Sequence, residues 1–310
     1  MDPERKLILL PMDGSEQSME VVRYISRAVN LVNTEIVLLS VIDKTPDVFW
    51  DPERDQAVSE HLEHMKSWDK YKEQKTRECF AAAAQILKTR GVPESALTCN
   101  VLRRQRGIAR DILDESRFGY DAVALARSGL GRIDEAMLGS VAAKVFINAT
   151  DATVCLLGGK PEAGRIFAAI DDSLGALRAI NFLGKLLNTP NALVCLAHIV
   201  RLPGTKNGEP LAEEIANRIT LAHETTMQRV FEKAAGRLID AGFAPENIST
   251  RVIKTSGSRA ATILNEAKAA HFPTIVVGRR GLDDVADFNM GRVPYKLGYI
   301  AREEALWLVA

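Results

Sequence analysis

The sequence predicts an α/β protein of two doubly wound domains, each with a five-stranded parallel sheet. Short apolar segments alternate with amphipathic segments of helical spacing along the whole chain, a pattern typical of parallel sheets covered on both faces. The same order of segments occurs twice. The length of 310 residues accommodates two ordinary domains. The repeat is also far longer than a solenoid unit, which excludes that class of fold.

Two features mark the repeat. An apolar run ends in an acidic residue in each half, at Asp13 after LILLPM and at Asp171 after IFAAI. Further along, residues 126–140 read ARSGLGRIDEAMLGS and residues 278–292 read GRRGLDDVADFNMGR. Both segments contain a small residue, two others, a glycine, nine others, and then glycine with a polar residue. This agreement indicates duplication of a whole domain.

In the first half, the apolar segment at 6–12 predicts a buried strand. Ser15 is a suitable N-cap for the helix expected from about 15 to 31. Residues 44–66 contain Pro46 and Pro52 and predict an irregular segment before a long helix that ends near Arg90. The remaining expected elements are strands at 35–42, 97–102, 121–126 and 152–157, and helices at 108–117 and 139–148.

The second half repeats this order after a short linker at about 158–164. We therefore expect one domain at 1–160 and another at 161–310, packed together because the linker is short. The expected strands are 165–170, 192–199, 248–253, 273–277 and 304–309, and the expected helices are 173–187, a long helix ending at Ala241, 259–270, and one after the glycine loop.

Composition narrows the class of protein. The 40 basic and 40 acidic residues give no net charge, which argues against nucleic acid as the main partner. The four cysteines show no CxxC spacing, and Cys155 and Cys195 lie in apolar runs, as expected for buried thiols in a reducing compartment. No signal peptide or membrane-spanning stretch is visible, so we expect a cytoplasmic protein.

The candidate chemistry lies where strands end. Ligands of doubly wound sheets bind at the carboxyl ends of the strands, where Asp13, Asp171 and both glycine loops fall. A glycine-rich turn that opens a helix exposes backbone N–H groups to a phosphate, and Ser140 could add its hydroxyl. We expect Asp13 to lie too far from the phosphates to bind them, so a base or ribose contact suits it better.

The same residues have plainer explanations. Glycines after strands often make only tight turns, and an aspartate before a helix is often an N-cap. One glycine pair alone would be weak evidence for a phosphate-binding turn. The combination of an aspartate loop with a widely spaced glycine pattern, found twice in one chain, is stronger.

The chain resembles the universal stress protein family in its tandem form, over nearly all of its length. The resemblance is carried by PMDGS at 11–15, LLSVID at 38–43, AIDDS at 169–173 and LAHIV at 196–200. It is carried also by the family's ATP pattern, Gly-x2-Gly-x9-Gly-(Ser/Thr). The resemblance implies a Rossmann-like fold of the adenine-nucleotide-hydrolase type. It also implies a stress-response protein that binds ATP, AMP or ADP, with or without Mg²⁺, and has no dedicated catalytic site.

In the first half, the resemblance implies that Asp13 and Val41 flank the adenine. Ribose and phosphates would then be held by Gly129, Gly139, Ser140 and Val141. Ala126 replaces the first glycine of the family pattern, and its methyl group either weakens binding or is tolerated if φ is negative.

In the second half, the corresponding residues are Asp171, Ile199, Gly278, Gly281 and Gly291. Here Arg292 stands in place of Ser or Thr, and it either clamps phosphate or fills the pocket. We favour closure, because a long side chain lies where a short one is expected. The first half is therefore predicted to be the better ATP site.

Other residues are weaker candidates. His61 and His64 lie three apart without a third ligand nearby, so we expect no metal site. His198 is expected at the edge of the second pocket, and Arg279 and Arg280 either attract phosphate or are solvated. The sequence has no Ser-His-Asp constellation and no P-loop, so we expect no enzyme. The alternatives are a scaffold that binds no nucleotide and a slow ATPase.

The last strand of each half, 152–157 and 304–309, is apolar and would lie at a sheet edge. An apolar edge strand invites pairing with another strand. Single-domain members of the resembled family commonly dimerise through this strand. We therefore expect an internal pseudo-dimer of the two domains, and further dimerisation of the whole chain stays open.

Overall fold

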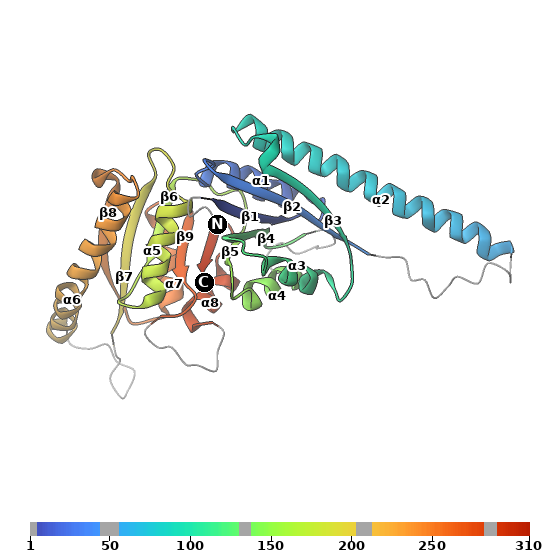
Figure 1. Ribbon diagram of the computed structural model, residues 1–310. Helices are drawn as coiled ribbons and strands as arrows, with labels where there is room; N and C mark the ends of the chain where they lie inside the picture. Colours follow the sequence, from blue (N-terminus) through green and yellow to red (C-terminus); the bar gives the residue numbers. More distant parts are fainter. Residues whose placement is uncertain (1–4, 44–55, 130–137, 203–212, 282–289) are drawn as a thin grey trace, which may run out of the picture.

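The computed structural model describes residues 5–43, 56–129, 138–202, 213–281 and 290–310. Within these residues the fold is α/β, with one ten-stranded sheet in the order β3-β2-β1-β4-β5-β10-β9-β6-β7-β8 (Figure 1). All strand pairs within each half are parallel, and β5 pairs antiparallel with β10. The predicted pair of five-stranded parallel sheets is confirmed, and the two are joined edge to edge.

The elements of the first half follow the predicted order. They are β1 (Lys6–Pro11), α1 (Glu16–Ala28), β2 (Thr34–Ile42), α2 (Gln56–Thr89), β3 (Leu97–Arg103), α3 (Ile108–Ser116), β4 (Ala122–Ala126), α4 (Ser140–Asn148) and β5 (Thr153–Leu157).

One boundary differs from the prediction. Residues 56–66 were expected to be irregular, but α2 already begins at Gln56. This stretch contains no proline or glycine and several good helix formers, which explains why it is helical. The prediction was wrong because it took the polar composition as a sign of irregular structure. Figure 1 shows α2 extending well beyond β3, away from the sheet.

The second half repeats the arrangement. Its elements are β6 (Arg165–Ala169), α5 (Leu174–Leu186), β7 (Leu193–Arg201), α6 (Glu213–Asp240), β8 (Ile248–Thr255), α7 (Arg259–Ala269), β9 (Thr274–Gly278), α8 (Arg292–Ile300) and β10 (Ala305–Val309). Residues 203–212, between β7 and α6, lie outside the described residues.

Two hydrophobic cores lie on opposite faces of the sheet. One core includes residues of α1, α2, α5 and α6, such as Leu87 and Leu238. The other includes residues of α3, α4, α7 and α8, such as Phe146 and Leu297. Each core continues across the boundary between the halves. The result is a three-layer arrangement, as expected for a sheet covered on both faces.

The two halves meet at the pair β5–β10, as the apolar edge strands predicted. Cys155 lies opposite Trp307, and these residues are 152 apart, the offset that also relates Gly129 to Gly281. The neighbouring pairs, Leu156 with Leu306 and Val154 with Leu308, exchange under the same offset. The strand register is therefore symmetric about the Cys155–Trp307 pair.

Polar contacts also cross this boundary within the core. Trp307 is fully buried, and its Nε1 donates to the hydroxyl of Tyr24 in α1 at 3.1 Å. The Tyr24 hydroxyl is 2.9 Å from Oγ1 of Thr274 in β9. Because a buried hydroxyl needs a partner, these bonds keep α1 aligned with the second half.

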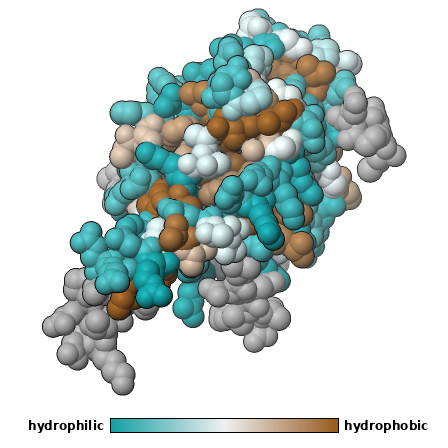
Figure 2. All heavy atoms as spheres, turned by 90° about the vertical axis from the view of Figure 1, so that its left-hand side faces the viewer, coloured by the Kyte–Doolittle hydropathy of each residue, from teal (hydrophilic) through white to brown (hydrophobic). Residues whose placement is uncertain are grey.

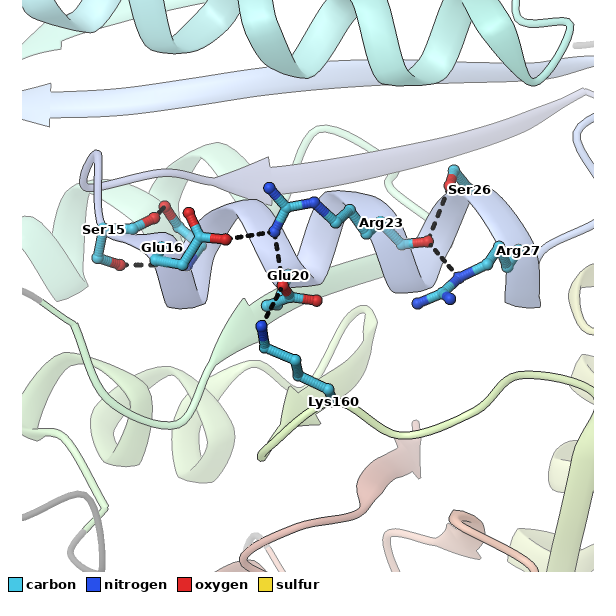
Figure 3. A network of polar contacts seen from close by, with 8 residues as sticks. Ser15, Glu16, Glu20, Arg23, Ser26, Arg27 and Lys160 are labelled. Atoms are coloured by element: carbon cyan, nitrogen blue, oxygen red, sulfur yellow. Dashed lines mark hydrogen bonds and ion pairs between the residues drawn. The ribbon is translucent and has the colours of Figure 1, made fainter.

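We call the boundary between the two halves, along the β5–β10 pair, the seam. The linker lies tightly against it. The Gly158 N–H donates to the Glu304 carbonyl at 3.0 Å, and a Cβ on Gly158 would overlap the Arg302 carbonyl. Figure 3 shows Lys160 beside Glu20 of α1, where Nζ and Oε1 are 3.2 Å apart. Glu20 also accepts a hydrogen bond from Arg23 at 2.6 Å, so this acid joins the linker to α1 (Figure 3).

The surface at the α6 end of the sheet has no large continuous hydrophobic area in the view of Figure 2. Figure 2 views this end and shows hydrophobic surface in separate areas among hydrophilic side chains. Ile215 and Leu221 of α6 are among the exposed apolar residues. Across the described part of the chain, no helix combines the length and apolar character needed to span a membrane. Cys155 and Cys195 are buried thiols, as predicted, and Cys99 is exposed.

Candidate functional site

The site of the first half forms where β1 and β4 end side by side. These strands pair directly, so Asp13 after β1 and Gly129 after β4 reach the same place. Asp13 Oδ1 accepts hydrogen bonds from the Ser15 N–H at 3.0 Å and the Ser15 hydroxyl at 2.6 Å. Ser15 in turn caps α1 by accepting from the Ser18 N–H at 3.1 Å. The cap of α1 therefore orients the Asp13 carboxylate.

The second carboxylate oxygen of Asp13 points at the glycine loop. A Cβ built on Gly129 would overlap Asp13 Oδ2. Glycine is needed at position 129 because the aspartate takes the place of a side chain there. The ends of β1 and β4 therefore bring Asp13 against the start of the glycine loop, closer than its place after a different strand suggested. Whether its carboxylate contacts base, ribose or phosphate stays a prediction.

Helix α4 begins directly after the loop, with Gly139 as its N-cap. The Gly139 N–H donates to the Arg127 carbonyl at 2.7 Å, and a Cβ on Gly139 would lie 2.9 Å from that oxygen. Among the described residues no side chain caps this helix, which leaves its first N–H groups for other acceptors. Together with the positive end of the helix dipole, they suit an anion. Ser140 is exposed at this end and Val141 is half-buried.

Two further predicted residues lie at the same edge of the sheet. Val41 is near the end of β2, which pairs with β1, and is half-buried. Ala126 is the last residue of β4 and pairs with Leu157. Its φ is not positive, so the backbone accommodates the methyl group. Residues 130–137 of the loop lie outside the described residues.

The second half reproduces this geometry around Asp171. The Ser173 hydroxyl donates to Asp171 Oδ1, and a Cβ on Gly281 would lie 2.8 Å from Asp171 Oδ2. The Gly291 N–H donates to the Arg279 carbonyl at 2.9 Å. Arg292 is exposed at the first position of α8. Residues 282–289 lie outside the described residues.

In the second half, the first turn of α5 lies directly against the start of the glycine loop. A Cβ on Gly278 would lie 2.8 Å from the main chain of Gly175, in the first turn of α5. A Cβ on Gly175 would overlap the carbonyl oxygen of Arg280. In the first half Gln17 and Ala126 stand at the equivalent positions, so the pair of glycines at this contact is found in the second half and not in the first.

A buried histidine supports the second aspartate loop. His198 Nδ1 is 2.9 Å from the carbonyl oxygen of Ile170, the residue before Asp171. Its ring stacks on His223 of α6, with 5.5 Å between the centroids. Burial lowers the pKa of His198. Sequence reasoning placed His198 at this edge but missed His223, whose position depends on where α6 crosses β7. The next residue in β7, the predicted Ile199, is buried.

Arg279 has a role that the sequence did not predict. It was expected to attract phosphate or to be solvated, but it is only 5% exposed and donates from Nη1 to the Ile147 carbonyl at 3.1 Å. Arg127, at the same position in the first half, is 3% exposed and was not considered at all. The available signal was an arginine after the first small residue of both glycine patterns.

Other parts of the described chain add little to the site. No group of three or more His, Cys, Asp or Glu in the described residues could hold a metal ion. The structure describes the helical backbone at His61 and His64 but not their side chains. A groove of about 420 Å³ lies between α6 and β8, lined by residues such as Phe231 and Arg251. None of the predicted site residues lines it.

Comparison with known proteins agrees with this architecture. The model of the universal stress protein family matches residues 4–154 and again residues 162–297. A universal stress protein from Archaeoglobus fulgidus superposes with a TM-score of 0.61 at 19% identity, covering 98% of this chain and 97% of that chain. A functionally unknown protein from Pseudomonas aeruginosa gives a TM-score of 0.54 at 13% identity, covering 98% and 92%. No curated protein matches the sequence.

The repeated sheet and its paired loops thus define a tandem Rossmann-like protein. The two family matches together cover most of the chain, so it belongs to the universal stress protein family.

Proposed function

We propose that this chain is a stress-response regulatory protein that binds ATP, or a related adenine nucleotide, in its first half. The observation that carries this proposal is the meeting of three features at one sheet edge. The Asp13 carboxylate lies on Gly129, Gly139 donates to the Arg127 carbonyl, and α4 opens without a side-chain cap from the described residues. A fixed carboxylate beside an uncapped helix end suits a ligand with a polar ribose and an anionic tail.

The residues fit the parts of a nucleotide. Asp13 and Val41 would contact the base and ribose, with Ala126 at the base of the loop. Gly129, Gly139, Ser140 and Val141 would hold the phosphates, because the start of α4 offers backbone N–H groups and the positive end of the helix dipole to an anion. We propose that Mg²⁺ accompanies the nucleotide, since Mg²⁺ is commonly held by substrate phosphates with one or two carboxylates.

We propose a weaker site, or none, in the second half. Asp171, Ile199, Gly278, Gly281, Gly291 and Arg292 repeat the arrangement. However, the first turn of α5 packs on the loop through Gly175, which supports a smaller space for a ligand. The protein would then bind one nucleotide per chain and act in the cytoplasm through binding, without a dedicated catalytic step.

We further propose that residues 1–160 and 161–310 are two domains related as an internal pseudo-dimer. The symmetric register of β5 and β10 supports an isologous contact. This contact occupies the edge strand of each half, which leaves β3 and β8 as the outer edges of the described sheet.

The test is isothermal titration of the full chain with ATP, ADP and AMP, with and without MgCl₂. We expect one binding event per chain for at least one nucleotide and loss of that event in Asp13→Ala. Chromatography of the denatured protein would show whether nucleotide is retained on purification. Absence of binding for all three nucleotides would leave the scaffold alternative. Release of phosphate that Ser140→Ala abolishes would favour the slow ATPase.

A further inference from the structure

Two buried arginines lie at the seam between the halves, each at the start of a glycine loop. Arg127 follows β4 and Arg279 follows β9, and they are related by the same offset of 152 residues. Their N–H groups donate to the last strand of their own half, at Leu157 (2.9 Å) and Val309 (2.8 Å). Their carbonyls accept from the glycine that opens their own helix, at 2.7 Å and 2.9 Å. The main chain of each arginine is thus part of its own loop.

The side chains cross to the opposite half. Arg279 donates from Nη1 to the Ile147 carbonyl at 3.1 Å, and from Nη2 to the carbonyls of Phe146 (3.3 Å) and Ala149. These groups form the carboxyl end of α4, which opens at the first glycine loop. Carbonyls at a helix end lack intrahelical partners and carry the negative end of the helix dipole, so a cation is favourable there.

Arg127 makes the reciprocal contact. It donates from Nη1 to the Gly298 carbonyl at 2.5 Å and from Nη2 to the Tyr299 carbonyl at 3.3 Å, at the carboxyl end of α8. Gly298 and Tyr299 are related to Phe146 and Ile147 by the same offset as the arginines. The two contacts therefore form a symmetric pair across the seam.

These cations are costly to bury. Burial lowers the pKa of Arg279 to about 10 and also lowers the pKa of Arg127. Within the described residues, Nε of each arginine is buried without a hydrogen-bond partner. An apolar side chain would fill the same space at lower cost, because buried charge requires compensation. Holding the two helix ends in place is a role that an apolar residue could not fill.

The helices are also in direct contact. A Cβ on Gly298 of α8 would lie 2.5 Å from Cε1 of Phe146 in α4. The Phe146 ring therefore occupies the space that a side chain at position 298 would need, and these two nine-residue helices pack directly on one another. A short helix held at its carboxyl end is also fixed at its amino end, where the glycine loop lies.

We propose that each arginine is a positioning residue for the glycine that opens the helix of the opposite half. Arg279 positions Gly139 through α4, and Arg127 positions Gly291 through α8. The structural part of this proposal is independent of ligand. Its consequence for nucleotide affinity rests on the proposed function above.

The structural part is tested by amide hydrogen exchange of the full chain without added nucleotide. In Arg279→Met we expect the amides of α4 to exchange about tenfold faster, with a smaller change in α8, because charged hydrogen bonds to the end of α4 are lost. Arg127→Met should show the reverse pattern. Arg302→Met removes an exposed arginine at the same seam and should leave both helices unchanged. If a Met variant fails to fold, Arg279→Lys and Arg127→Lys replace it in the same measurement. They keep the charge but lose the planar guanidinium group that donates several hydrogen bonds at once.

The functional part is tested by titration with ATP and MgCl₂. Arg279→Met should weaken binding about tenfold although the site lies in the other half, and Arg279→Lys should weaken it less. The proposal would be overturned if each variant accelerated amide exchange in the helix of its own half, or in neither helix. If the wild type binds no nucleotide, the proposed function fails while the exchange pattern still decides the role of the arginines.

Discussion

Gly139 and Gly291 hold equivalent positions, yet they have different room for a side chain. An added Cβ would lie 2.9 Å from the Arg127 carbonyl at Gly139, but 3.5 Å from the Arg279 carbonyl at Gly291. Both have negative φ, so backbone strain does not distinguish them. The hydrogen bond from the glycine N–H to the same arginine carbonyl is also shorter in the first half, at 2.7 Å against 2.9 Å.

We therefore expect Gly139→Ala to lower the free energy of unfolding by about 1–3 kcal/mol through overpacking, and to weaken ATP binding. Gly291→Ala should change stability by less. Urea unfolding of both variants provides the comparison. Equal losses in the two variants would show that the carbonyl contact is not the cause.

His198 should make stability depend on pH. Because burial lowers its pKa in the folded protein, the unfolded chain binds the proton more readily. The free energy of unfolding should then fall as pH drops below about 6.5, the ordinary value for histidine. Asp171 opposes this trend, whereas His223 and Arg259 strengthen it.

His198→Asn should flatten this dependence while keeping a donor near the Ile170 carbonyl. The measurement is denaturant unfolding at pH 5.5 and 7.5. His271→Asn is a matched control, because His271 is exposed and its φ of 56° is one that asparagine tolerates. The interpretation fails if His198→Asn and the wild type lose the same stability between the two pH values.

At the scale of elements, α4 and α8 are equivalent helices that begin differently. Both follow a glycine N-cap and neither has a side-chain cap. α4 begins with Ser140 and α8 with Arg292, and both side chains are exposed. The sequence favoured closure of the second site by Arg292. Because this side chain is exposed, we now attribute the proposed closure to the contact of α5 with the start of the loop.

Ser140→Ala should weaken ATP binding by about 1–2 kcal/mol, because one hydroxyl–phosphate hydrogen bond is lost. Stability should stay close to the wild type, since Ser140 is exposed. Calorimetric titration measures the first effect and thermal unfolding the second. Unchanged affinity would remove Ser140 from the binding site.

Arg292→Ser gives α8 the residue that α4 carries. We expect the stoichiometry to remain at one nucleotide per chain, because the first turn of α5 still packs on the second loop. Titration of Arg292→Ser at high ATP concentration measures this. A second binding event would show that Arg292, rather than α5, closes the second site.

At the scale of the whole molecule, the seam joins the halves through strands, buried hydrogen bonds and helices. The β5–β10 pair continues the sheet, Trp307 bonds Tyr24 on one face, and the two arginines hold α4 and α8 on the other. Lys185 and Asp121 add an ion pair across the seam at 2.5 Å, but both are partly exposed, so its contribution is small.

A fragment of residues 1–160 should form a homodimer, because its β5 edge loses β10 and can pair with its own copy. Leu156→Lys in the same fragment should weaken that dimer, since Leu156 is fully buried at the strand pair. Sedimentation over a range of concentrations measures the assembly. A soluble, folded fragment that stays monomeric at high concentration would contradict strand pairing as the basis of the seam.

Much of this architecture could be read from the sequence. Apolar periodicity located the strands and most helix ends, and the repeat located the seam, because both signals lie in residue order. Even the pairing of the last strands followed, since Leu156 and Leu308 are apolar residues at a predicted edge. The start of α2 was missed because residues 56–66 are mostly polar, a composition that they share with irregular segments.

The sequence by itself therefore determined the α/β class, the duplication, and the positions of the aspartate and glycine loops. Only the tertiary structure decided which of these residues touch. In the structure the Asp13 carboxylate lies on Gly129, and Gly175 packs on the second loop. His223 stacks on His198, and the side chains of Arg127 and Arg279 cross the seam. The physical reason is the same in each case. These contacts join elements far apart in the chain, and their distances depend on strand order and helix placement rather than on local pattern.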